Sequence, residues 1–414
     1  MSSRSIYRSI NTDLFPQRME VTFSDGQQRQ TLVYEKATWT IGDEDRGLRY
    51  GENPDQQAAL YQLVNGNLCL GEVESIQAGR HLASDVELLQ SGKHPGKINI
   101  TDADSALNIL RYLSHQPATV IIKHNNPCGV AIGESLAESY HKAYYADRVA
   151  AFGGAVAVNR ELDLATAEQI AESYSEVVVA PDFAPGTIEK LSSRKNLRIM
   201  RIANMDRLQS YVGKRVVEFS SLIDGGLIVQ WSQVPQIASA EDFVPARTER
   251  KGEVYEISRA PTRDELSDMY FGWMVEFGVT SNSVIYVKDG ATVGIGTGEQ
   301  DRVGVAEIAR DKAYRKFADR LAWERYEQPF REIEAGEKGR EVWAETVAAK
   351  GGLIGAAMVS DAFFPFRDGV DVGIKEGISA IVQPGGSLRD FEVIEACNES
   401  NVTMVFTGQR SFRH

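Results

Sequence analysis

The chain has 414 residues, enough for two or three domains, and its 43% hydrophobic and 25% charged residues are typical of a globular protein. Its formal net charge of −13 argues against general binding to nucleic acid or to a membrane surface, since both need a basic face. The three cysteines lie far apart and form no CxxC pair, which indicates a reducing compartment.

The first residues, Met1 to Arg8, lack the apolar core of a signal peptide, and no apolar run approaches the roughly 18 residues of a membrane span. The sequence therefore predicts a cytoplasmic protein. Within residues 1–45, the β-branched stretches 21–23 and 31–35 flank Asp25-Gly26 and predict a hairpin.

Residues 48–56 combine Arg, Gly, Asn and Pro and are expected to form a loop. Arg49 and Tyr50 could offer hydrogen-bond donors to an anion there. An ordinary surface turn is the alternative.

Thr101 or Asp102 is expected to cap a helix that runs through Leu113. A buried strand at 119–122 then stops at Lys123 and His124, and the chain is expected to turn at Pro127 and Gly129. Because open α/β sheets bind ligands beyond the carboxyl ends of their strands, Lys123 and His124 are candidates for a paired charge and base. A polar loop with a solvated lysine and a packed histidine is the alternative.

A helix at 135–145 leads to the apolar run 150–159, where Gly153 and Gly154 indicate close approach of a ligand or tight strand packing. A helix at 164–173 and a strand at 177–180 follow. Alternating strands and helices favour a parallel or mixed α/β sheet.

The second half begins with a helix at 264–277 and a strand at 281–287, followed by a hairpin turn at Lys288-Asp289-Gly290. Residues 294–302 lack the spacing of a dinucleotide fingerprint. Asp301 is expected to cap the next helix, and Arg302 in its first turn indicates either an anionic ligand or a local ion pair. A later helix is expected to end at 358–359.

Phenylalanines at 363, 364 and 366 suit a flat aromatic ligand, or else a hydrophobic plug over the core. Strands are expected at 380–382 and 403–406, and the tail that follows carries Arg410 and Phe412. Helices, short strands and glycine turns recur in both halves, which makes an internal duplication plausible.

Seven stretches resemble, in order, the aminoimidazole-carboxamide ribonucleotide (AICAR) transformylase family, the C-terminal part of a bifunctional enzyme of purine biosynthesis. They are RYGENPDQ (49–56), KHNNPCG (123–129), AFGG (151–154), SNSV (281–284), GIGTGEQDRV (294–303), SDAFFPFRDGVD (360–371) and RSFRH (410–414). The resemblance runs from about residue 45 to the last residue.

The resemblance implies an α/β fold of tandem duplicated cytidine-deaminase-like three-layer units with mixed sheets. The expected segments are an N-terminal extension (1–45), a first unit (46–210), a connecting segment (211–260) and a second unit (261–414). A homodimer with active sites shared between its subunits is also implied.

The family transfers a formyl group from 10-formyltetrahydrofolate to the 5-amino group of AICAR, without a catalytic metal. Matched by motif, His124 would be the general base and Lys123 would stabilise the transition state. The residues that would contact AICAR are Arg49, Tyr50, Asn99, Gly153, Glu176, Asn282, Arg302, Phe363, Arg410 and Phe412, of which Asn99 and Glu176 lie outside the motifs. The residues that would lie against the folate are Val303, Asp368, Ser387 and Leu388.

Two departures from the family pattern stand out. The chain starts almost at the transformylase part, so the resemblance implies no IMP cyclohydrolase activity and a separate cyclohydrolase acting downstream. Asp55 stands where the family commonly has histidine, which leaves local substrate contacts open.

The implied reaction suits the Lys-His pair. Attack by the weakly nucleophilic amine creates positive charge on nitrogen and an oxyanion on oxygen. An imidazole can remove the proton near neutral pH, and an ammonium can stabilise the oxyanion.

Two alternatives were weighed. A zinc deaminase needs His-x-Glu and Pro-Cys-x-x-Cys, but Cys128 is followed by Gly129, Val130 and Ala131, and no His-x-Glu occurs. A non-catalytic or divergent AICAR-binding homologue, acting on another acceptor or donor, stays open.

Overall fold

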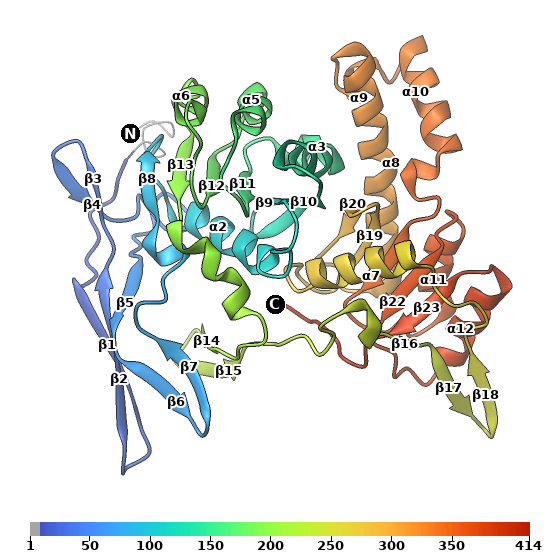
Figure 1. The fold of residues 1–414 in the computed structure, drawn as a ribbon, viewed down its shortest axis with the longest axis horizontal. Helices are drawn as coiled ribbons and strands as arrows, with labels where there is room; N and C mark the ends of the chain where they lie inside the picture. Colours follow the sequence, from blue (N-terminus) through green and yellow to red (C-terminus); the bar gives the residue numbers. More distant parts are fainter. Residues whose placement is uncertain (1–8) are drawn as a thin grey trace. The chain divides into compact units, whose positions relative to one another are not determined.

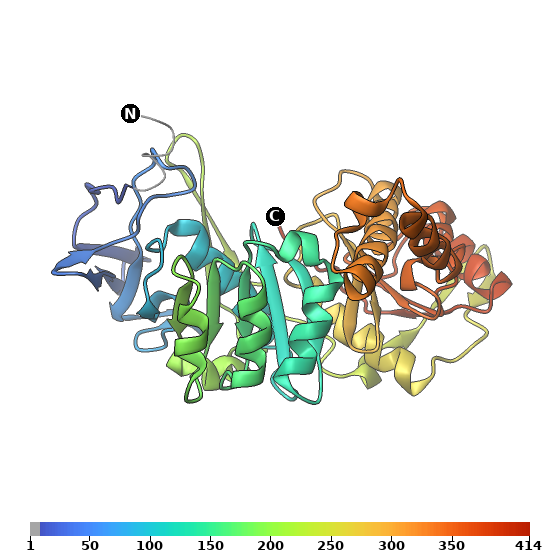
Figure 2. The same ribbon diagram turned by 90° about the horizontal axis from the view of Figure 1, so that it is seen from above.

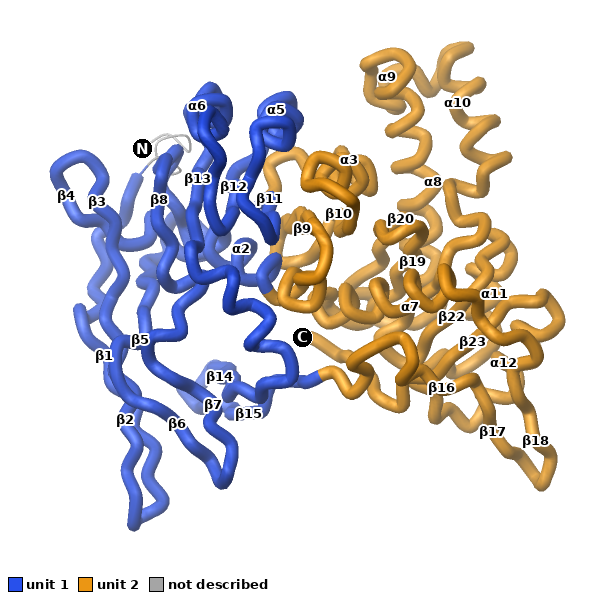
Figure 3. The backbone as a smooth tube through the Cα atoms, in the orientation of Figure 1, with its two compact units in different colours: residues 1–107, 155–234 blue, residues 108–154, 235–414 orange. Residues whose placement is uncertain are grey.

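The computed structural model describes residues 9–414, so Met1 to Arg8, where no signal peptide is expected, lie outside the described residues. The chain divides into two compact units, residues 1–107 with 155–234 and residues 108–154 with 235–414 (Figure 3). Among the described residues, no helix is long and apolar enough to cross a membrane. The four segments expected from the sequence stay a prediction.

The first unit begins with short antiparallel strands. β1 pairs with β2 around Asp25-Gly26, which confirms the expected hairpin, and β5 adds a third strand. Leu32, Leu68 and Val217 form a small core beneath them. The elements of this part are β1 (Arg18–Ser24), β2 (Arg29–Lys36), β3 (Trp39–Ile41), β4 (Glu44–Arg46), β5 (Tyr61–Asn65), β6 (Asn67–Leu70), β7 (Val73–Gln77), β14 (Val217–Ser221) and β15 (Leu227–Trp231).

The rest of the first unit is an α/β layer. β11, β12 and β13 run parallel, and β8 pairs antiparallel with β13, so the expected mixed sheet is confirmed. The residues of β11 and β12 are buried throughout, which is why they appear as short continuous apolar runs in the sequence. The elements are β8 (Glu87–Gln90), α2 (Lys97–Leu110), β11 (Ala155–Val158), α5 (Leu164–Glu172), β12 (Val177–Ala180), α6 (Thr187–Ser192) and β13 (Arg198–Arg201). α2 continues past the division between the units.

The predicted start of α2 is wrong. The helix begins at Lys97, so Thr101 and Asp102 lie inside it rather than at its cap. The Asn99 side chain instead accepts the backbone N–H of Gly96 at 3.0 Å, which satisfies one of the unpaired donors at the start of the helix.

The second unit contains a mixed sheet in the strand order β16-β23-β22-β21-β19-β20-β10-β9. Its strands are β9 (Ala118–Lys123), β10 (Asn126–Ile132), β16 (Val244–Pro245), β19 (Val284–Lys288), β20 (Ala291–Gly296), β21 (Ala357–Ser360), β22 (Ala380–Gln383) and β23 (Thr403–Phe406). Its helices are α3 (Leu136–Ala146), α4 (Arg148–Ala151), α7 (Arg263–Glu276), α8 (Arg302–Tyr326), α9 (Phe330–Ile333), α10 (Glu337–Ala348), α11 (Arg367–Ile374) and α12 (Asp390–Glu399). A separate hairpin joins β17 (Arg247–Arg250) and β18 (Glu253–Glu256).

Helices cover both faces of this sheet. α7 lies on one face, and α8 and α11 lie on the other (Figures 1 and 2). Tyr286 and Met358 belong to the core beneath α8 and α11, whereas Val287 and Val359 approach Gly272 of α7. This alternation also corrects the expected helix end at 358–359. β21 is a strand buried on both faces, and such a strand lacks the polar alternation that would distinguish it from a buried helix.

One order of elements occurs twice along the chain. Each series has a helix, a two-stranded hairpin and one or more helices, followed by three parallel strands that two helices connect. The first series is α2-β9-β10-α3-α4-β11-α5-β12-α6-β13. The second series is α7-β19-β20-α8-α9-α10-β21-α11-β22-α12-β23. The duplication considered from the sequence is therefore present in the element order.

Candidate active site

The candidate base lies in the hairpin between β9 and β10. Lys123 pairs with Asn126, so His124 and Asn125 alone form the turn, and Pro127 and Gly129 lie inside β10. The expected turn at Pro127 and Gly129 is therefore wrong. A bulge between these two residues shifts the register of the strands, which is how the hairpin accommodates a proline.

The backbone of this turn is unusual for its residues. His124 and Asn125 both have φ of 60°, in the left-handed region. A two-residue hairpin turn with two positive φ values normally carries Asn-Gly or Asp-Gly, because a side chain is unfavourable there. Strain of this kind is common at functional sites, and here it holds an exposed imidazole at the tip of a hairpin.

Two side chains, Lys123 and Asn126, fix the position of this hairpin. The Lys123 ammonium donates to the carbonyl oxygen of Phe152 at 2.6 Å. The Asn126 side-chain oxygen accepts the backbone N–H of Thr280 at 2.9 Å and the hydroxyl of Thr297 at 3.1 Å. The hairpin is therefore tied to the loop before β19 and to the residue that follows β20.

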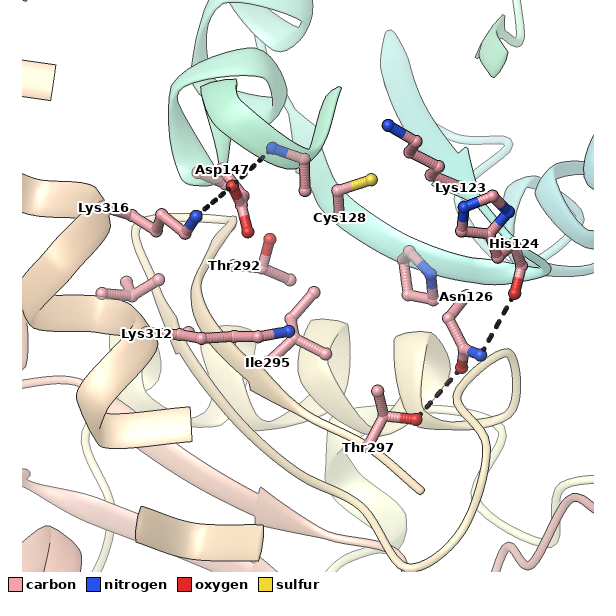
Figure 4. Close-up of a pocket in the computed structure, with 15 residues that line it drawn as sticks. Lys123, His124, Asn126, Cys128, Asp147, Thr292, Ile295, Thr297, Lys312 and Lys316 are labelled. Carbon is pink, nitrogen blue, oxygen red and sulfur yellow. Dashed lines mark hydrogen bonds and ion pairs between the residues drawn. The ribbon is translucent and has the colours of Figure 1, made fainter. Parts of the chain in front are cut away.

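Lys123 and His124 line a pocket of about 270 Å³ (Figure 4). The β9–β10 hairpin forms one wall, and β20 and α8 form the facing one. The other residues that line it are Asn126, Pro127, Cys128, Ala146, Asp147, Ala150, Thr292, Val293, Gly294, Ile295, Thr297, Lys312 and Lys316. The two predicted catalytic residues thus share a concave, largely apolar cavity, as ligand sites generally do.

Arg49, Tyr50, Asn99 and Glu176 lie close together in the first unit. The guanidinium of Arg49 donates to the Tyr50 hydroxyl at 2.5 Å and to the Lys93 carbonyl at 2.6 Å. The Asn99 amide donates to Glu176 at 3.4 Å. These four predicted AICAR contacts come from three separate stretches of sequence, and folding gathers them.

Sequence reasoning missed Arg198 and His94 in the same cluster. Arg198 is 1% exposed and contacts Glu176 at 3.3 Å and the His94 carbonyl at 3.3 Å. Burial lowers the pKa of Arg198, and burial likewise lowers the pKa of His94, with nearby arginines adding to the effect. Two buried guanidinium groups face a single carboxylate here, so the cluster has positive charge available for an anion. The only sequence signal was an arginine at the start of β13, a strand that ends with a second arginine, Arg201.

Arg302 is held by a buried network in the second unit. It donates to Asp361, to Asn282 at 2.8 Å and to the Ser283 carbonyl at 3.0 Å. Asp361 is fully buried and also accepts the hydroxyl of Ser281. The structure thus shows an ion pair for Arg302, although its partner lies 59 residues away rather than nearby in the sequence.

Glu276 is a second buried carboxyl beside this network. Burial, together with the charge of Asp361, raises its pKa well above the ordinary value. The hydroxyl of Ser283 donates to it at 2.7 Å. The network thus holds two buried carboxyl groups beside one buried arginine.

The remaining predicted contacts lie at the surface of the second unit. Phe363 is 41% exposed, whereas Phe364 is fully buried in the core, so only part of the aromatic segment is a plug. Arg410 stacks on the Phe412 ring at 4.7 Å. Gly153 has φ of 76°, a conformation that suits glycine.

The predicted folate contacts vary in exposure. Leu388 is 94% exposed and Asp368 is exposed, while Ser387 is partly buried and Val303 packs against the core. These contacts stay predictions. Within residues 9–414, no group of three or more His, Cys, Asp or Glu side chains is arranged to hold a metal ion.

An α/β fold with a strained His-Asn turn beside a concave pocket is typical of the class of proteins that bind small molecules. Comparison with known proteins narrows this class, because residues 13–312 match the model of the AICARFT/IMPCHase bienzyme family. The chain belongs to this family.

Bacterial relatives support the assignment. A bifunctional purine biosynthesis protein PurH from Oceanobacillus iheyensis is 35% identical over 385 residues, covering 93% of this chain and 61% of the relative. PurH from Caldicellulosiruptor saccharolyticus is 37% identical over 367 residues, covering 89% of this chain and 59% of the relative. The chain spans about three fifths of the length of these curated relatives.

Proposed function

We propose that this chain transfers the formyl group of 10-formyltetrahydrofolate to the 5-amino group of AICAR, a step of purine biosynthesis. The observation that carries the proposal is the placement of Lys123 and His124 on one wall of a pocket in a chain of this family. The proposal covers formyl transfer and leaves ring closure to IMP outside it.

His124 would act as the general base. Its imidazole is exposed at the hairpin tip and, among the described residues, has no hydrogen-bonding or ionic partner. A ring nitrogen can therefore accept the proton that the amine loses as it attacks the formyl carbon. Positioned general bases contribute about 10²–10⁴ in rate.

Lys123 would stabilise the oxyanion that forms on the formyl oxygen. Its ammonium carries three hydrogens, and the carbonyl of Phe152 accepts one of them at 2.6 Å. Two hydrogens stay available, and the carbonyl contact limits the motion of the flexible lysine. A donor held in place in this way stabilises developing charge without reorganisation.

AICAR would be bound by the predicted contacts, in a homodimer with shared active sites. The cationic cluster of Arg49 and Arg198 is suited to a phosphate, because two guanidinium groups are balanced by one carboxylate. Arg302 is suited to a positioning role, because Asp361 already neutralises it.

The direct test mixes the purified protein with AICAR and 10-formyltetrahydrofolate and follows the release of tetrahydrofolate. We expect AICAR-dependent release without added metal. AICAR binding without any turnover would contradict the proposal and favour a non-catalytic or divergent homologue. In that case, Asp55 is the first position to change to histidine.

A further inference from the structure

Among the residues that line the pocket, positive side chains outnumber negative ones. Lys123, His124, Lys312 and Lys316 line it, and Asp147 is the one carboxylate among the lining residues. Asp147 accepts the Lys316 ammonium at 2.8 Å and the backbone N–H of Ala150 at 2.8 Å, where it caps α4. The carboxylate is therefore already occupied by Lys316 and a helix end.

Unlike Lys316, Lys312 is not balanced by Asp147. It lies one helical turn before Lys316 on α8, so the two ammonium groups face the same side of the helix. Its side chain extends into the cavity (Figure 4), and no described residue forms an ion pair with it. Like charges at this spacing repel, and an anion in the pocket would remove the repulsion.

The walls of the pocket favour an anion at this position. Val293 and Ile295 of β20 line the same pocket as Lys312 with apolar surface, which strengthens the interaction between an ammonium and an oxyanion. Lys123 and His124 line the same cavity, so a ligand bound by Lys312 would also be near the reacting groups.

We propose that Lys312 forms an oxyanion subsite in the His124 pocket that binds an anionic group of one of the two substrates. The inference deepens the proposed function and rests on it for the identity of these substrates. The anionic group is either the phosphate of the nucleotide or a glutamate carboxylate of the folate. Both present oxygen atoms that accept hydrogen bonds from an ammonium.

The test measures binding by calorimetry to wild type, Lys312→Gln and Lys312→Arg. Arg315→Gln is the matched control, because Arg315 is an exposed cation on the same helix that does not line the pocket. The probes are AICAR, its nucleoside without phosphate, 10-formyltetrahydrofolate, and the corresponding pteroate without glutamate.

We expect Lys312→Gln to weaken the binding of one anionic probe about tenfold, which is the effect of losing one charged hydrogen bond. Lys312→Arg should restore most of the affinity, and Arg315→Gln should bind as wild type does. A loss for AICAR but not for its nucleoside identifies the phosphate, and a loss for the folate but not for the pteroate identifies the glutamate.

Equal affinities of Lys312→Gln and wild type for all four probes would overturn the subsite. Absence of turnover in wild type, together with Lys312-dependent binding, would overturn the proposed reaction and leave the subsite supported. The two proposals can therefore fail separately.

Discussion

The two hairpins of the repeated series of elements have the same turn conformation and different turn residues. Lys288, Asp289 and Gly290 in the second hairpin correspond to Lys123, His124 and Asn125 in the first, and each turn has two positive φ values.

The lysine before each turn also makes the same kind of hydrogen bond. Lys123 donates to the Phe152 carbonyl shortly before β11, and Lys288 donates to the Ile354 carbonyl shortly before β21. The second hairpin carries Asp-Gly, which this turn favours, whereas the first carries His-Asn at a cost in stability. The lysine contact is therefore common to both hairpins, whereas the proposed general base is present in the first hairpin alone of these two.

The largest expected difference between the two hairpins is the effect on kcat of replacing their lysines. Lys123→Met should lower kcat about 10²–10³-fold, because it removes the charge that stabilises the oxyanion. Lys288→Met removes the matching hydrogen bond in the second hairpin and should leave kcat within about twofold of wild type. Steady-state release of tetrahydrofolate by both variants measures this difference, and equal losses would show that the lysines act only through the fold.

The turn glycine of the second hairpin allows a smaller test. At Gly290 an added Cβ would lie 2.7 Å from Cγ1 of Ile132, and φ is 68°. Gly290→Asn should lower the free energy of unfolding by about 1–2 kcal/mol without changing kcat, through left-handed strain and displacement of Ile132. Urea unfolding measures the change.

Gly252 in the turn between β17 and β18 is the control for this variant. Its φ is 84°, but nothing lies within 4 Å of an added Cβ. Gly252→Asn should therefore lower the free energy of unfolding by less than Gly290→Asn does. Equal losses would show that contact with Ile132 contributes nothing.

The helices that precede the hairpins differ at their starts, which gives a pH-dependent prediction. α7 begins with a capping box of Thr262 and Glu265, whereas α2 has no acidic residue in its first turn. Burial opposes ionisation of Glu265, but hydrogen bonds from Arg259 and from the Thr262 backbone outweigh it and hold the pKa at about 2.

Because this pKa lies below the ordinary 4.5, the stabilisation is complete above about pH 4.5 and is lost as the pH falls toward 2. Glu265→Gln should lower the free energy of unfolding by about 1 kcal/mol at pH 7, after allowance for partial exposure, and by progressively less below pH 4.5. Unfolding at pH 7 and pH 3.5 compares the variant with wild type, and an equal difference at both values would contradict the assignment.

Much of the fold could be predicted because local signals were strong. The Asp25-Gly26 and Asp289-Gly290 turns, the helix expected at 135–145, the cap at Asp301 and the buried strand at 119–122 all agree with the structure. β21 was missed because burial on both faces removes the alternation by which a strand is recognised. The start of α2 was missed because its stabilising contact is an asparagine inside the first turn.

The site was less predictable, since its contacts are distant in sequence. Lys123 and His124 were found as adjacent residues at the end of an apolar run, but no local pattern placed Lys312 beside them. Arg302 left two alternatives open, and only the fold shows that Asp361 is its partner. Arg198 was overlooked because β13 begins and ends with an arginine, and no local pattern shows that Arg198 is the buried one.

The most direct test of the central claim compares matched variants of the two turns. Asparagine tolerates positive φ, so His124→Asn and Asp289→Asn preserve both backbones while His124→Asn removes the base. In the assay with AICAR and 10-formyltetrahydrofolate, we expect His124→Asn to lower kcat about 10²–10⁴-fold and Asp289→Asn to leave it unchanged. Near-wild-type turnover of His124→Asn would contradict the account.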